Sequence, residues 1–196
     1  MYPLITIPSF AKKSFFDFTK EDAKQYLQWF FKIKKERIEI LENNIQQLYP
    51  YWKSDYTRAS LVELYKWFEQ QVAYRLMNEE EKEAVKKQLN TTPLLIDVIP
   101  IPHTTFTVET VSICFDAGLY FGETLIINGQ NLKWFQKLTS TNYIDYAQPL
   151  IGRKDSKVPI NPRRIAESLA QSILDKDVQE TTFEMIYDKL VNEFFK

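Results

Sequence analysis

The sequence predicts a helix-dominated α+β protein: an N-terminal antiparallel helical hairpin, a buried helix, a small antiparallel β-hairpin or sheet, and two C-terminal helices. Three observations lead to this fold class. Long segments repeat apolar residues at helical spacing, two short segments have strand-like composition, and only 4 of 196 residues are glycine. We expect a helical region over 1–92 and an α+β region over 93–196, packed as a single domain.

The first predicted helix covers 19–49. Thr19 followed by Asp22 is similar to a capping box, and Pro50 provides a stop. A helix this long needs a long partner, and a helix predicted over 57–77 can supply it as the second arm of a hairpin. The apolar seam of the first helix alternates spacings of four and three and is broken by one lysine: Leu27, Phe31, Lys34, Ile38, Leu41, Ile45 and Leu48.

A third helix is predicted over 78–90, on the surface. Acidic residues begin it and lysines follow, which suits the helix dipole, and its apolar content is low. The next segment, 91–106, contains three prolines and several β-branched residues. This composition predicts a short edge strand or an extended crossing segment, because proline cannot donate to a strand ladder.

Residues 107–128 admit two interpretations. As a helix, the segment has Thr107 as its N-cap and Gly129 as a left-handed C-cap. As strands, it alternates apolar and polar residues, with turns at the DAG and NG sequences. The helix is favoured because it separates the acids from Gly118 and Gly122, which then lie on an apolar face where another element can approach the backbone closely.

The run GLYFGE at 118–123, with Trp134 after it, resembles the G-x-Y-φ-G-E … W pattern of uncharacterised bacterial domain families. Asn161 and Pro162 also resemble a pattern that follows the hairpin in those families. The likeness covers 107–170. It implies that the glycine run is helical, and it brings no established activity.

The remaining elements are a β-hairpin and two helices. Asn161 is a predicted N-cap with Pro162 at the first helical position, and Thr181 with Glu184 is a predicted capping box for the last helix. Two strand-like runs joined by the sequence TSTN predict the hairpin: 131–138 and 143–151.

Asp116 and Glu123 are the most interesting acids because they lie in a largely apolar segment. In a helix they are about 10 Å apart along the axis, too far to bind one metal without another element. One hypothesis makes them ligands for a cation or a basic group. The favoured hypothesis makes them structural partners of arginines such as Arg163 and Arg164. The binding residues predicted from these patterns are Asp116, Tyr120, Glu123, Trp134, Arg163 and Arg164.

Several kinds of chemistry lack the residues they require. One histidine and one cysteine exclude a multi-histidine or multi-cysteine metal site. A nucleophilic dyad of Cys114 and His103 is disfavoured because Cys114 lies in an apolar run typical of a buried, inert thiol. No dinucleotide, P-loop or G-x-S-x-G motif is present. We therefore predict no catalytic residue, no metal and no cofactor.

Charge and composition narrow the function further. The net charge is −1, so no global field attracts nucleic acid or an anionic membrane, and a strongly acidic nuclease inhibitor is disfavoured. No uninterrupted apolar run approaches the ~20 residues of a membrane helix. The single cysteine fits a reducing, cytoplasmic setting.

Aromatic residues make up 15% of the chain. Trp29, Trp52 and Trp67 either form an exposed patch for a partner or fill the core, and the core interpretation is favoured. The leading functional hypothesis is a non-catalytic bacterial protein that binds another protein, as an accessory or immunity-type module. The alternatives are a hydrolase-type enzyme with an acidic site at 116–123, formed by Asp116, Tyr120 and Glu123, and a structural homo-oligomer formed along the apolar seam.

Overall fold

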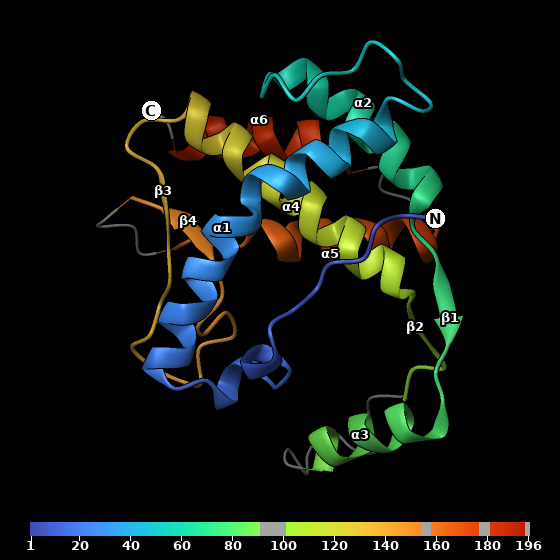
Figure 1. The fold of residues 1–196 in the computed structure, drawn as a ribbon, viewed down its shortest axis with the longest axis vertical. Helices are drawn as coiled ribbons and strands as arrows, with labels where there is room; N and C mark the ends of the chain where they lie inside the picture. Colours follow the sequence, from blue (N-terminus) through green and yellow to red (C-terminus); the bar gives the residue numbers. More distant parts are fainter. Residues whose placement is uncertain (91–100, 154–157, 177–180, 195–196) are drawn as a thin grey trace.

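The computed structural model describes residues 1–90, 101–153, 158–176 and 181–194. Within them, α-helices dominate and two small antiparallel sheets have two strands each, which confirms the predicted α+β class (Figure 1). The described elements in chain order are η1 (Ser9–Ala11), η2 (Phe15–Asp17), α1 (Lys20–Ile45), α2 (Arg58–Gln71), β1 (Tyr74–Leu76), α3 (Glu79–Asn90), β2 (Thr104–Phe106), α4 (Val108–Asn128), β3 (Lys133–Phe135), β4 (Leu150–Gly152), α5 (Pro162–Leu174) and α6 (Phe183–Phe194).

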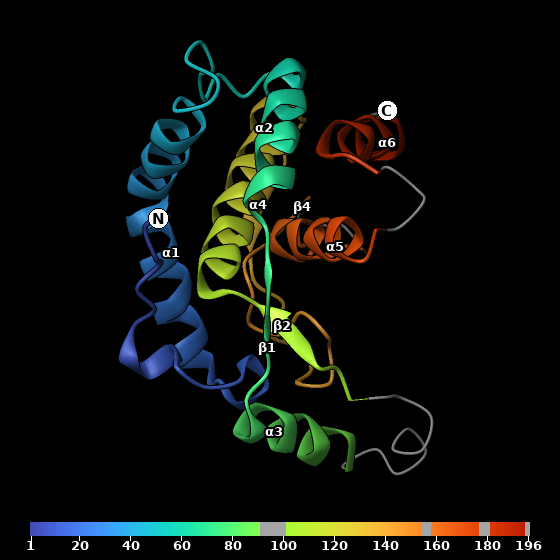
Figure 2. The same ribbon diagram turned by 90° about the vertical axis from the view of Figure 1, so that its right-hand side faces the viewer.

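The central element is α4, with α1 on one side and α5 and α6 on the other (Figure 2). The Thr107 hydroxyl accepts a hydrogen bond from the Thr110 amide at 3.1 Å, as an N-cap should. The helical interpretation is confirmed and the strand alternative is wrong. Gly129 corrects one detail, because its φ of −95° is not left-handed. By length and composition α4 could cross a membrane, but 83% of its apolar window is buried, as in the core helix of a soluble fold.

The two long N-terminal helices run antiparallel, as predicted, but α4 supplies the surface that each of them covers (Figure 2). Thr19 and Asp22 form the complete capping box of α1. The second helix ends at Gln71 instead of 77, which corrects the prediction. Thr110 explains the early end, because its hydroxyl accepts a hydrogen bond from the Ala73 amide at 2.8 Å and the chain then continues as β1.

A two-stranded ribbon, β1 with β2, carries α3 away from the body of the protein (Figure 1). The rings of Tyr74 and Phe106 stack across the ribbon with centroids 5.6 Å apart. Asn78 caps α3 by accepting from the Glu81 amide at 2.8 Å, so the predicted third helix is confirmed. Of the proline-containing segment, residues 91–100 lie outside the described residues, and its end forms the strand β2.

The second sheet differs from the predicted hairpin. β3 pairs antiparallel with β4, but the run 143–149 forms turns instead of a strand, so the connection is much longer than TSTN. Asp145 is the physical reason, because Arg164 and Asn161 hold its carboxylate against the start of α5. Ala147 follows with a φ of 60°, which a regular strand does not allow.

Both C-terminal helices are present, with one change in capping. The Asn161 side chain accepts from the Arg164 amide at 3.2 Å, and Pro162 occupies the first helical position, as predicted. In α6 the hydroxyl that accepts from the helix is that of Thr182, which receives the Met185 amide at 3.2 Å. The predicted capping box began one residue earlier, at Thr181.

Aromatic side chains fill the core, which confirms the favoured interpretation of the tryptophans. Trp52 and Trp67 are each 2% exposed, and Trp29 packs partly buried at the edge of the core. The buried stripe of α1 is displaced from the predicted seam, because Phe31 and Leu48 are exposed. Its members are Ala23, Tyr26, Phe30, Arg37, Ile38, Leu41 and Ile45.

Candidate functional site

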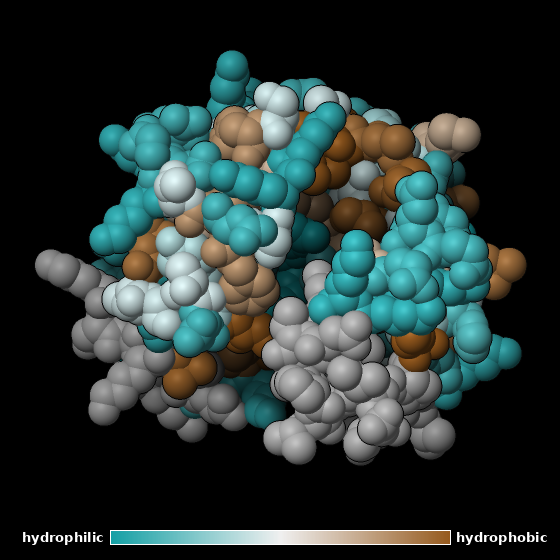
Figure 3. All heavy atoms as spheres, turned by 90° about the horizontal axis from the view of Figure 1, so that it is seen from below, coloured by the Kyte–Doolittle hydropathy of each residue, from teal (hydrophilic) through white to brown (hydrophobic). Residues whose placement is uncertain are grey.

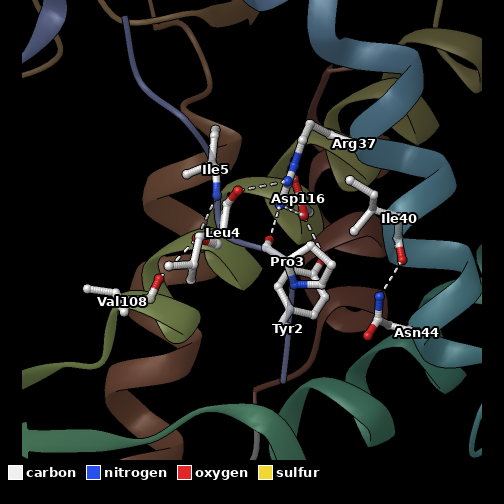
Figure 4. Close-up of polar contacts among 10 residues, drawn as sticks. Tyr2, Pro3, Leu4, Ile5, Arg37, Ile40, Asn44, Val108 and Asp116 are labelled. Carbon is white, nitrogen blue, oxygen red and sulfur yellow. Dashed lines mark hydrogen bonds and ion pairs between the residues drawn. The ribbon is translucent and has the colours of Figure 1, made fainter. Parts of the chain in front are cut away.

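Asp116 is fully buried on α4 and holds the best-defined polar cluster in the protein (Figure 4). The Arg37 guanidinium donates to both carboxylate oxygens, from Nε at 2.8 Å and from Nη2 at 2.6 Å. The Tyr2 hydroxyl donates to Oδ2 at 2.5 Å. Three donors from two distant segments therefore converge on one carboxylate, a charge-assisted arrangement.

The same cluster fixes the N-terminal segment against α1 and α4 (Figure 4). Arg37 Nη2 also donates to the Pro3 carbonyl at 3.0 Å, and the Ser112 hydroxyl accepts from the Ile5 amide at 3.1 Å. Burial raises the pKa of Asp116 to about 6, although the hydrogen bonds and charge of Arg37 lower it. The role of Asp116 in this geometry is to tie together three parts of the chain.

Tyr120 lies one helical turn further along α4 in a separate environment. Its hydroxyl is 2.6 Å from the Ser60 hydroxyl and accepts from the Tyr56 amide at 3.0 Å. Burial raises the pKa of Tyr120 to about 12, so the phenol stays protonated at neutral pH. The hydroxyl therefore stabilises the loop before α2, whose residue Tyr56 has a φ of 57°.

Glu123 has a third set of partners. The Lys34 ammonium lies 2.8 Å from its carboxylate, and the Trp134 indole nitrogen donates to it at 2.6 Å. Lys34 is the residue that interrupts the predicted apolar seam of α1. The interruption therefore marked a charged partner for α4, which was the one signal in the sequence that pointed to this pair.

The arginines predicted to answer these acids bind elsewhere. Arg163 donates to Glu167 at 2.8 Å, one turn along α5, and Arg164 donates to Asp145 at 2.9 Å. The structural interpretation of Asp116 was therefore correct in kind but named the wrong partners. Sequence reasoning missed Arg37, whose position in the buried stripe of α1, four residues before Leu41, was the available signal.

Cys114 and His103 do not form the nucleophilic dyad. The Cys114 thiol is buried and lies 3.8 Å from the carbonyl oxygen of Ala166 on α5, whereas His103 is exposed before β2. Burial raises the pKa of Cys114, so its thiolate is disfavoured at neutral pH. No group of three metal-ligating side chains is found among the described residues.

The two helical glycines behave as predicted and bring elements into close contact. A Cβ added at Gly118 would lie 2.8 Å from the Arg163 Cα, within the backbone of α5. One added at Gly122 would lie 2.5 Å from the Trp134 ring. Gly118 therefore sets the distance between α4 and α5, and Gly122 provides the surface on which Trp134 rests.

The predicted binding residues consequently do not converge on one site. Asp116, Tyr120 and Glu123 face three environments, each filled by the protein's own side chains. Trp134 and Arg163 both line a narrow aromatic crevice beside Gly118, but Arg163 is already paired. Of the six predicted residues, Arg164 alone lines the large groove of the described surface.

This groove lies between α5 and α6 and has a volume of about 1340 Å³. Its floor is apolar, and its rim carries Arg164, Ser168, Ser172 and Lys189. Apolar side chains also reach the lower face of the molecule, where they lie among hydrophilic groups (Figure 3). The apolar residues that line the groove are Val158, Pro159, Ile160, Ile165, Leu169, Ile186 and Leu190.

Comparisons of the chain with known protein families, with curated proteins and with solved structures found no match. The likeness to the bacterial domain families therefore stays a prediction, and the geometry of the chain itself must carry any proposal of function.

Proposed function

We propose that this protein acts by binding another protein, without catalysing a reaction, and that the α5–α6 groove is the binding surface. The observation that carries the proposal is the groove, about 1340 Å³ with an apolar floor and a polar rim. Recognition sites are concave and mostly apolar with a few oriented polar groups, and interfaces join an apolar centre to a polar rim.

The geometry gives less support to an acidic hydrolase-type site. Asp116 is buried under Arg37 and Tyr2, and Tyr120 is held by Ser60. Glu123, the third member, is bound by a lysine and a tryptophan. A general acid or base must be within reach of a substrate, and none of the three lines the groove.

A homo-oligomer along the N-terminal helix also receives less support. Ile38, Leu41 and Ile45, which form the centre of the predicted seam, are buried in the protein's own core. The apolar area that would drive association along this helix is therefore already used within one chain.

The proposal places the protein in the bacterial cytoplasm as an accessory or immunity-type module. A single buried thiol suits a reducing compartment, and a net charge of −1 suits a partner that is recognised by shape and apolar contact more than by long-range attraction.

Site-specific photo-crosslinking in cells of the source organism tests the proposal. A photoreactive side chain at Ser168, on the groove rim, is compared with one at Lys35, which is 90% exposed on α1. We expect a higher-mass adduct from position 168 and none from position 35. Equal adducts from both positions, or none from either, would refute the groove as a binding surface. An adduct of twice the chain mass would identify a second copy and favour the oligomer instead.

A further inference from the structure

The shape of the α5–α6 groove restricts what can fill it. On α5 the lining residues run from Arg164 to Ser172 and recur every three or four positions, so they form a stripe about 12 Å long at 1.5 Å per residue. On α6 the facing residues are Ile186, Lys189 and Leu190, again at helical spacing. The groove is therefore a trough between two helices, and its length follows their axes.

A trough of this kind accepts a third helix better than an extended strand. A strand gains affinity by pairing with the open edge of a sheet, but both walls here are helices whose backbone groups are bonded internally. A helix instead inserts its own row of side chains between the rows of the walls. The apolar floor, with Leu169 buried at its centre, requires an apolar stripe on the occupant.

The charges around the trough indicate what should flank that stripe. Asp145 is neutralised by Arg164, and the two nearest acids of α6, Glu184 and Asp188, are both bound by Arg58 on α2. The Lys189 ammonium has no hydrogen bond or ion pair within the described part of the chain. The uncompensated charge on the rim is therefore positive.

We infer that the occupant of the α5–α6 groove is an amphipathic helix of a partner protein, with an acidic residue beside its apolar stripe that pairs with Lys189. This inference rests on the proposed binding function and adds the chemistry of the partner. An exposed ion pair adds little affinity, so the acid selects orientation and partner, while the apolar stripe supplies most of the binding.

A displayed library of helix-favouring 16-residue peptides tests the inference. Peptides are selected on the full chain and then measured by fluorescence anisotropy against three variants. Ser168→Trp fills the trough, Lys189→Glu reverses the rim charge, and Lys35→Glu is the matched control on exposed α1.

We expect enriched peptides with apolar residues at i, i+3 or i+4 and i+7 and an acid at one flanking position. Ser168→Trp should abolish their binding, Lys35→Glu should leave it unchanged, and Lys189→Glu should weaken it about fivefold and select basic peptides when the library is screened again. Groove-dependent peptides without an acidic preference would overturn this inference but leave the proposed function standing. A library that yields no groove-dependent peptide would count against both.

Discussion

Replacing Gly118 with alanine places a methyl group against the backbone of α5. The added Cβ would lie 2.8 Å from the Arg163 Cα, 2.8 Å from the Pro162 carbonyl oxygen and 2.9 Å from the Arg163 nitrogen. Side-chain rotation cannot relieve these contacts because the obstructing atoms are backbone. The first turn of α5 must move away from α4, although the Asn161 cap and the Arg164–Asp145 pair hold it in place.

Two opposing effects set the magnitude. Overpacking costs about 1–3 kcal/mol, and backbone contacts favour the upper end of that range. Alanine in place of glycine within a helix returns about 1 kcal/mol. We therefore expect Gly118→Ala to lower the free energy of unfolding by about 2 kcal/mol, which corresponds to a melting temperature about 4–8 °C lower for a chain of this size.

Urea titration and thermal melting, followed by circular dichroism, measure this change. Gly129→Ala is the matched control, because the φ of Gly129 is −95°, which alanine adopts readily. It should be neutral or stabilising by up to about 1 kcal/mol. A Gly118→Ala variant as stable as the wild type would show that α4 and α5 are not in this close contact, and the reasoning would be refuted.

Three further predictions concern charged and reactive groups. Arg37→Met leaves Asp116 buried without its cation, so the pKa of that carboxyl should rise further above about 6; the variant should lose about 3–5 kcal/mol at pH 8 and recover part of it toward pH 5, measured by urea titration, and a deficit independent of pH would contradict this. Hydrogen bonds from Thr19 and Lys13 hold the pKa of Asp22 at about 2, so its contribution to stability should be present above pH 4 and lost as the pH falls toward 2, and Asp22→Asn should abolish that part of the acid dependence. Cys114 should react with a thiol reagent at the rate of unfolding, and rapid labelling of the native protein would contradict its burial.

Local patterns predicted much of the fold. The capping box of α1, the Thr107 cap of α4 and the Asn161–Pro162 start of α5 were all recognisable, because each depends on side chains within a few residues of the backbone groups they satisfy. The close-packing role of Gly118 followed from its position on an apolar helical face.

The candidate site was predicted less completely. Arg164 was placed correctly among the predicted binding residues, since it lines the groove. Neither the groove nor Lys189 was anticipated, because a trough forms only where two helices that are distant in sequence leave space between them. The partners of Asp116 were missed for a similar reason, since they come from positions 79 and 114 residues away in the chain.

By itself, therefore, the sequence determined the helices, most of their caps and the apolar faces, since those depend on residue type and on spacings of a few positions. Tertiary structure decided which charges meet: Arg37 with Asp116, Lys34 with Glu123 and Arg58 with α6. An ion pair depends on the position of two side chains in space, and that position is fixed only after the helices have packed around α4.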